Sequence, residues 1–139
     1  MTVEEKIQMI VEKFSVKEES AKQTYEEFYA DNDYFETIDK KDFQYELENN
    51  LHFFKDEHDM RNIARQYVEG LEKSFDKKEV YNMTDMIRAY IDYDLLAKDI
   101  LKNNDRLDTT EGVFLNGELW KEILENLRTK IKFWRDYNE

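Results

Sequence analysis

The sequence of 139 residues has no cysteine, no proline and only three glycines, Gly70, Gly112 and Gly117. Without cysteine the chain has no disulfide, no thiolate metal ligand and no cysteine nucleophile, which fits a reducing compartment. Proline and glycine are the residues that most strongly disfavour the interior of a helix. Their scarcity predicts a mainly α protein, and we expect one domain over residues 1–139.

Long apolar runs are missing as well. The first residues, MTVEEKIQMIVEKF, are charged throughout and contain neither the apolar core nor the small-residue cleavage site of a signal peptide. No apolar run approaches the roughly 20 residues that a helix needs to cross a bilayer. We therefore expect a cytoplasmic protein that does not bind membranes.

The sequence also lacks the motifs that carry catalysis or bind a cofactor. It has no glycine-rich phosphate loop and no serine in a G-x-S-x-G elbow. His52 and His58, which we expect on the surface, do not have the i, i+4 spacing of a helical zinc pair. The stretch from Asp31 resembles the start of a calcium loop, but Glu36 replaces its glycine and Asp42 its bidentate glutamate. We expect no catalytic residue, no metal and no cofactor.

Apolar residues at helical spacing predict about six helices. Thr2 and Glu5 form a capping box at the start of the first helix. The helices are expected over residues 2–14, 16–29, 39–54, 59–73, 83–100 and 118–137. Turn residues flank short apolar runs between residues 103 and 117, which predicts either a small β hairpin near residues 106–116 or an ordered loop.

What the sequence has in excess is negative charge. There are 33 acidic and 21 basic residues, which gives a net charge of −12 and a pI near 4.7. A chain of this charge repels nucleic acid and anionic membranes. Its content of hydrophobic residues, 40%, is too high for a disordered chain. We expect its tyrosines, which stand among acids, to pack in the core with the hydroxyl at the rim or to contact a partner.

The acids are concentrated in one quarter of the chain. Between Glu26 and Asp59 the net charge is −9, from twelve acidic and three basic residues. The acids of this stretch are Glu26, Glu27, Asp31, Asp33, Glu36, Asp39, Asp42, Glu46, Glu48, Asp56, Glu57 and Asp59. A second group, Asp92, Asp94 and Asp99, is expected on one helix, with Asp92 and Asp99 two turns apart on one side.

Such acids can resemble the charge pattern of DNA. Carboxylates one helical turn apart lie about 5–6 Å from each other, and duplex DNA carries one charge per roughly 1.7 Å of its axis. A protein that binds DNA through lysine and arginine could therefore bind rows of carboxylates by the same physics. By composition alone, a solvated acidic face that keeps the protein soluble is the favoured interpretation.

Three stretches in the second half of the chain share a pattern. Residues 59–69 read DMRNIARQYVE, residues 89–100 read AYIDYDLLAKDI, and Gly112 stands directly before Val-Phe. In type, order and approximate spacing these stretches resemble the C-terminal portion of the ArdA antirestriction family, which has D-M-x-x-V-A-R-x-Y-I-E, Y-I-D-Y-x-x-x-x-x-D and G-I-F. The Y-I-D-Y piece is the most specific. The resemblance covers residues 59–114.

The resemblance implies a protein of a phage or mobile element that mimics DNA and inhibits type I restriction and modification enzymes, usually as a dimer. A CRISPR nuclease or another DNA-binding defence protein would suit the same surface. Positions that match the family and are expected to determine the fold are Ala64, Tyr67, Tyr90, Ile91 and Tyr93. Those expected on the mimicking surface are Asp59, Glu69, Asp92 and Asp99.

Acidity and resemblance together predict a DNA-mimic inhibitor of a bacterial DNA-binding defence enzyme, which does not bind nucleic acid itself. Two alternatives stay open. One is an acidic interaction module, such as a regulatory or conjugation accessory protein of a mobile element, whose acids only confer solubility. The other is an enzyme whose carboxylates are brought together by folding.

Overall fold

The chain of the computed structural model divides into two compact units, which are described separately. Unit 1 comprises residues 1–58 and 104–117, and unit 2 comprises residues 59–103 and 118–139. The structure describes residues 1–72 and 92–117, so the helix predicted over 118–137 and most of the one over 83–100 lie outside the described residues. The prediction of a single domain stays a prediction.

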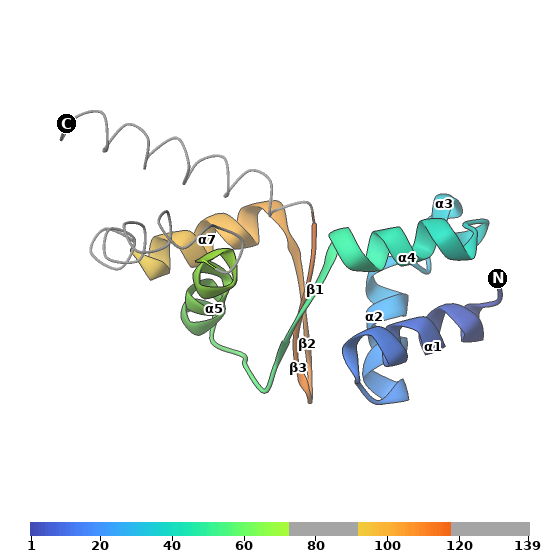
Figure 1. Ribbon diagram of the computed structural model, residues 1–139, viewed down its shortest axis with the longest axis horizontal. Helices are drawn as coiled ribbons and strands as arrows, with labels where there is room; N and C mark the ends of the chain where they lie inside the picture. Colours follow the sequence, from blue (N-terminus) through green and yellow to red (C-terminus); the bar gives the residue numbers. More distant parts are fainter. Residues whose placement is uncertain (73–91, 118–139) are drawn as a thin grey trace. The chain divides into compact units, whose positions relative to one another are not determined.

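Four helices come before the first strand of unit 1 (Figure 1). They are α1 (Val3–Phe14), α2 (Glu18–Phe28), α3 (Asp33–Glu36) and α4 (Lys40–Asn49). The predicted capping box at α1 is confirmed, because the Thr2 hydroxyl accepts a hydrogen bond from Glu5 N at 3.1 Å and the Glu5 carboxylate accepts one from Thr2 N. Asp39 begins α4 in a similar way, since its carboxylate accepts from Asp42 N at 2.8 Å.

The helices of unit 1 are followed by a three-stranded antiparallel sheet. Its strands are β1 (Leu51–Lys55), β2 (Asp105–Thr109) and β3 (Gly112–Asn116), in the order β1-β3-β2. The hairpin predicted near residues 106–116 is confirmed, because β2 and β3 pair directly. The protein is thus mainly helical with a small antiparallel sheet.

The prediction of one helix over residues 39–54 is wrong beyond Asn49. Leu51 and Phe54 continue the helical spacing, but the same residues also fit a strand, because aromatic and apolar residues favour sheets when a partner strand is present. That partner is β3, whose Phe114 stands opposite Phe53 in the register. Pairing with a strand some 60 positions further along cannot be read from the local pattern.

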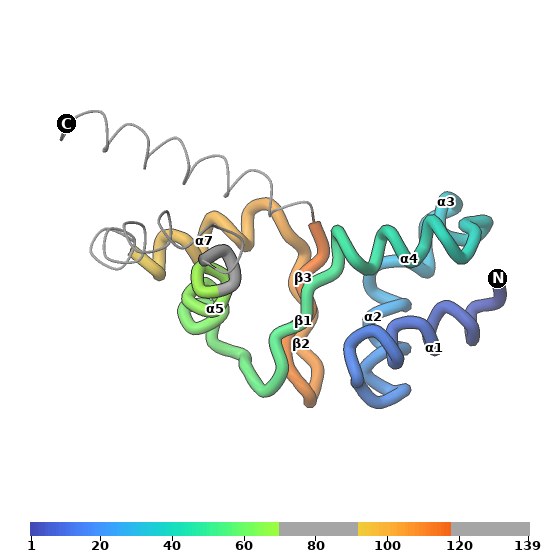
Figure 2. Tube along the Cα trace, in the orientation of Figure 1, coloured from blue at the N-terminus to red at the C-terminus, as the bar shows by residue number. Residues whose placement is uncertain are grey.

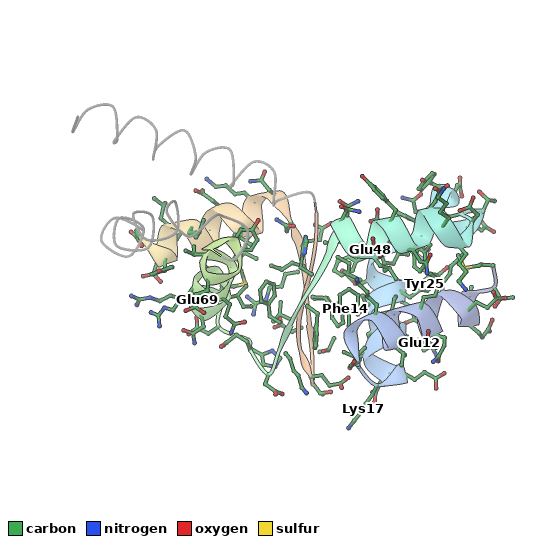
Figure 3. All side chains as sticks on the ribbon, viewed as in Figure 1. Glu12, Phe14, Lys17, Tyr25, Glu48 and Glu69 are labelled. Atoms are coloured by element: carbon green, nitrogen blue, oxygen red, sulfur yellow. The ribbon has the colours of Figure 1, made fainter. Side chains whose placement is uncertain are left out.

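Aromatic rings fill the core of unit 1 between the helices and the sheet. One of these rings is that of Phe14 on α1 (Figure 3). Its centroid lies 6.3 Å from that of Phe53 and 5.5 Å from that of Phe114. Tyr29 packs edge to face against Phe43, and its hydroxyl accepts a hydrogen bond from Asn116 Nδ2 at 3.0 Å. Burial raises the pKa of Tyr29 well above its usual range. The expectation that tyrosines pack in the core is confirmed for this residue.

In unit 2, α5 (Met60–Glu72) packs against α7 (Tyr93–Asn103) (Figure 2). The helix predicted over residues 59–73 is confirmed. Among the side chains of these helices that the structure describes, the buried ones are those of Ile63, Ala64, Tyr67, Val68, Ala97 and Ile100. Among the described residues, no helix combines the length and the apolar character that a membrane span requires.

Candidate partner-binding surface

The two units differ sharply in charge. Unit 1 contains 19 acidic and 8 basic residues, a net charge of −11, whereas unit 2 contains 14 acidic and 13 basic residues, a net charge of −1. Almost the whole charge of the protein therefore belongs to unit 1. An even distribution, as expected for acids that only confer solubility, would give the units similar charges.

Within unit 1 the acids are densest over residues 26–48, which we call the acidic segment. It comprises the C-terminal end of α2, α3, α4 and the connections between these helices. It holds nine acidic and two basic residues. Eight of the nine acids are exposed, and Glu46 is half-buried. The predicted site residues that follow this segment in unit 1, Asp56 and Glu57, are exposed and half-buried respectively.

The carboxylates of the acidic segment are not neutralised by neighbouring lysines. Among residues 1–50, all of which the structure describes, no lysine forms an ion pair with a carboxylate. Lys40 and Lys41 stand next to Asp39 and Asp42 in the sequence and still do not pair with them. These carboxylates are therefore available to an incoming cation.

Two of these carboxylates have a role in the fold. Asp39 caps α4, and Glu46 Oε2 accepts a hydrogen bond from Asn50 Nδ2 at 2.6 Å. In the described part of the chain, the other seven acidic side chains of the segment form no hydrogen bond: Glu26, Glu27, Asp31, Asp33, Glu36, Asp42 and Glu48. The fold of the acidic segment therefore does not use the hydrogen-bonding capacity of these seven carboxylates.

The acidic segment also presents two aromatic rings to solvent. Tyr34 on α3 is 62% exposed and Tyr45 on α4 is 63% exposed. Tyrosine is enriched where proteins contact each other, because it offers a large rigid surface and a hydroxyl. Tyr34 and Tyr45 therefore do not pack in the core, and contact with a partner is the expectation that is left for them.

The predicted site residues of unit 2 lie in different surroundings. Asp59 caps α5, and Asp92 caps α7 instead of lying within it, with Oδ1 accepting hydrogen bonds from the amides of Asp94 and Leu95. Aspartate favours this position because its carboxylate satisfies amides that the helix leaves free. Asp94 lies 3.9 Å from Arg61.

Asp99, also in unit 2, lies 3.9 Å from Lys102. Glu69 is exposed on α5 (Figure 3). Acids and bases thus lie side by side in this unit. Asp94 and Asp99 both lie on α7, five positions apart, and the acidic segment belongs to the other unit.

One acid outside the predicted set is central to the packing of unit 1. The Glu111 carboxylate, in the turn between β2 and β3, accepts a hydrogen bond from Lys17 N at 2.9 Å and so caps α2 from outside that helix. Hydrogen bonds from the Ser20 side chain and Lys17 N lower the pKa of Glu111. The lack of a capping side chain at Lys17 is a signal that such a partner is needed.

A second acid outside the set, Asp108, pairs with Arg106. The guanidinium reaches both carboxylate oxygens at 2.9 and 3.0 Å, and His58 Nδ1 lies 3.2 Å from Oδ1. The hydrogen bond from Arg106, and to a lesser extent that with His58, lowers the pKa of Asp108. These contacts link His58, the last of residues 1–58, to strand β2. The guanidinium of Arg106 neutralises the Asp108 carboxylate.

The two histidines of unit 1 lie in different surroundings. His58 is exposed, as expected, but His52 is half-buried on β1, and its burial lowers its pKa. Among residues 1–72 and 92–117, no group of three histidine, aspartate or glutamate side chains is arranged to hold a metal ion.

No protein-family model matches the chain, and no curated protein or solved structure matches it. The resemblance to segments of the ArdA family therefore stays a prediction.

Proposed function

We propose that the protein is a DNA mimic that occupies the DNA-binding channel of a bacterial defence enzyme with the acidic segment of unit 1. The observation that carries the proposal is the separation of charge: unit 1 has a net charge of −11 and unit 2 of −1. Our default target is a type I restriction and modification enzyme, and a CRISPR nuclease is an alternative of the same kind.

The physics of the interaction follows from the way DNA-binding channels work. A channel that binds DNA presents lysine and arginine side chains and holds mobile anions when it is empty. Carboxylates that have no cation of their own, such as those of the acidic segment, can displace these anions as phosphates do. Carboxylates already paired within the protein would first have to give up their partners, and this cost lowers the affinity.

The exposed tyrosines of the acidic segment support a contact with protein. An arginine of the channel can lie over a tyrosine ring and gain a cation–π interaction, typically about 0.5–1 kcal/mol at an exposed site. Such contacts would contribute binding free energy that depends less on salt than the charge interaction does. In this proposal the protein performs no chemistry, needs no cofactor, acts in the cytoplasm and, as the resemblance implies, forms a homodimer.

The direct test is competition with DNA. A fluorescent duplex that contains the recognition site is bound to a purified type I methyltransferase, and the protein is added while the fluorescence anisotropy is followed. We expect the duplex to be released. We also expect the affinity of the protein for the enzyme, measured separately without DNA, to fall as salt is added, because salt screens the carboxylates.

Other results would overturn the proposal. If the protein releases DNA neither from a type I methyltransferase nor from a CRISPR nuclease, both targets are excluded. Binding to the enzyme without release of DNA, or binding that ignores salt, would favour the acidic interaction module, in which the carboxylates only confer solubility.

A further inference from the structure

Lys6 on α1 is buried, with 1% of its surface exposed, and it is the one buried charged side chain among the described residues. Its Nζ donates hydrogen bonds to the carbonyl oxygens of Phe35 at 2.6 Å and of Glu36 at 3.3 Å. Both carbonyls belong to α3, within the acidic segment. We infer that Lys6 is a positioning residue, which fixes the carboxylates of residues 31–39 in the arrangement that a partner binds.

The short helix α3 cannot hold its own shape. It contains four residues, one turn, and a single turn is not stable alone because nucleating a helix orders several residues for one hydrogen bond. The last carbonyl oxygens of a helix also accept no hydrogen bond from an amide of the same helix. Lys6 supplies the donor for two of these carbonyls, so it ties α3 to α1.

No other hydrogen bond between described residues ties α3 to α1. Phe35 packs edge to face on Tyr29 at 4.8 Å, and Ile38 is buried, so apolar contacts hold the segment against the core. Among the hydrogen bonds of the described residues, those of Lys6 are the ones that join α3 to α1, whereas Asp39 bonds to the first turn of α4, which follows it directly. Apolar contacts tolerate sliding, whereas hydrogen bonds fix direction.

The charge of Lys6 is compensated without any carboxylate. A buried ammonium is costly unless hydrogen bonds compensate it, and bonds from a charged donor are stronger than neutral ones. The ammonium also lies 5.9 Å from the centre of the Tyr25 ring. It uses carbonyls and a ring as its partners instead of a carboxylate, so it holds the segment without neutralising any acid of the surface.

The experiment compares Lys6→Met with Lys13→Met in the full chain. Methionine keeps the length of the side chain and removes the charge and the donors. Lys13 is exposed on the same helix, so both variants have the same net charge. The readout is hydrogen exchange of the amides of Phe35 and Glu36, which both bond to Asn32 O, against the amides of α2 as an internal reference.

We expect Lys6→Met to speed exchange at these two amides at least tenfold and to leave α2 close to wild type, whereas Lys13→Met changes neither. Lys6→Arg, which keeps the charge and the donors, should restore most of the protection and serves as the informative variant if Lys6→Met does not fold. Equal exchange at residues 35 and 36 in the two methionine variants would overturn the inference.

A second readout concerns the partner and rests on the proposed function. In the competition assay with the type I methyltransferase, Lys6→Met should compete at least tenfold less well than Lys13→Met. If wild type releases DNA and Lys6→Met releases it equally well despite a loosened α3, Lys6 does not position the contact carboxylates. If wild type itself fails to release DNA, the proposed function fails, and hydrogen exchange still decides whether Lys6 holds α3.

Discussion

Single carboxylates of unit 1 divide into those that the fold needs and those that it does not. Asp39 and Glu111 each satisfy backbone amides at the start of a helix, and Asp108 is held by Arg106. The side-chain carboxylates of seven other acids of the acidic segment, by contrast, make no hydrogen bond among the described residues. A substitution at the first kind should change stability, and one at the second kind should change partner binding.

Glu111 allows this distinction to be tested through pH. Hydrogen bonds from Ser20 and Lys17 lower its pKa in the folded protein below the ordinary 4.5. A carboxyl group whose pKa is lowered by folding stabilises the protein above that ordinary value, and this contribution disappears as pH falls through the lower, folded-state pKa. We predict that Glu111→Gln unfolds at a lower urea concentration than wild type at pH 7 and that the difference shrinks at pH 3.5.

The control for this prediction is Glu27→Gln, which removes the same charge from a side chain that makes no hydrogen bond in the described part of the chain. It should not lower the urea midpoint at pH 7. A difference between Glu111→Gln and wild type that is the same at both pH values would show that the carboxylate is not the stabilising group.

At the scale of elements, local patterns predict what local forces decide. The capping box of Thr2 and Glu5, the apolar stripe of α5 and the turn residues of the hairpin all act within a few positions, and the sequence predicts each of them correctly. The local pattern wrongly predicts a helix at β1, because the partner strand that decides its structure is remote in the sequence. The single turn of α3 has no apolar stripe of its own to reveal it.

The candidate site could be predicted in part. Clustering of the acids between Glu26 and Asp59 is visible in the sequence, and most of them are exposed. The sequence does not reveal that the acids near α5 and α7 belong to a nearly neutral unit, since that depends on which residues fold together. Lys6 falls on the buried stripe of α1 with Ile10, and a lysine at such a position is a signal that long-range acceptors exist.

Gly112, at the start of β3, shows how the hairpin depends on one backbone conformation. Its φ is +148°, which side chains disfavour, and a Cβ atom there would collide with the carbonyl oxygen of Phe54 on β1. We predict that Gly112→Ala lowers the free energy of unfolding by about 2 kcal/mol or more. Thermal unfolding checks this, with Thr110→Ala in the same turn as a control that should stay within about 0.5 kcal/mol of wild type. A tolerated Gly112→Ala would show that β1 and β3 can move apart.

At the scale of the whole molecule, charge and resemblance fall in different places. The stretches for which we propose a resemblance to the ArdA family lie in unit 2 and in the hairpin of unit 1, whereas the acidic segment lies in the helical part of unit 1, ahead of them in the sequence. In our account the acidic segment contacts the target, and the acids of unit 2 do not dominate the interaction. We therefore predict that the affinity for the target depends on where the carboxylates lie and not on their number alone.

The most direct measurement compares two triple variants that each bring the net charge from −12 to −9. One neutralises the acidic segment by Asp31→Asn, Asp33→Asn and Glu36→Gln. The matched control neutralises unit 2 by Glu69→Gln, Asp94→Asn and Asp99→Asn. Both are assayed for release of duplex DNA from a type I methyltransferase over a series of salt concentrations.

We predict that the first variant competes at least tenfold less well than wild type and depends less steeply on salt, because three exposed charge contacts of about 0.5–1 kcal/mol each are lost. The unit 2 variant should stay within about twofold of wild type. Equal losses in the two variants, or no loss in the first, would contradict the claim that the acidic segment of unit 1 is what the target recognises.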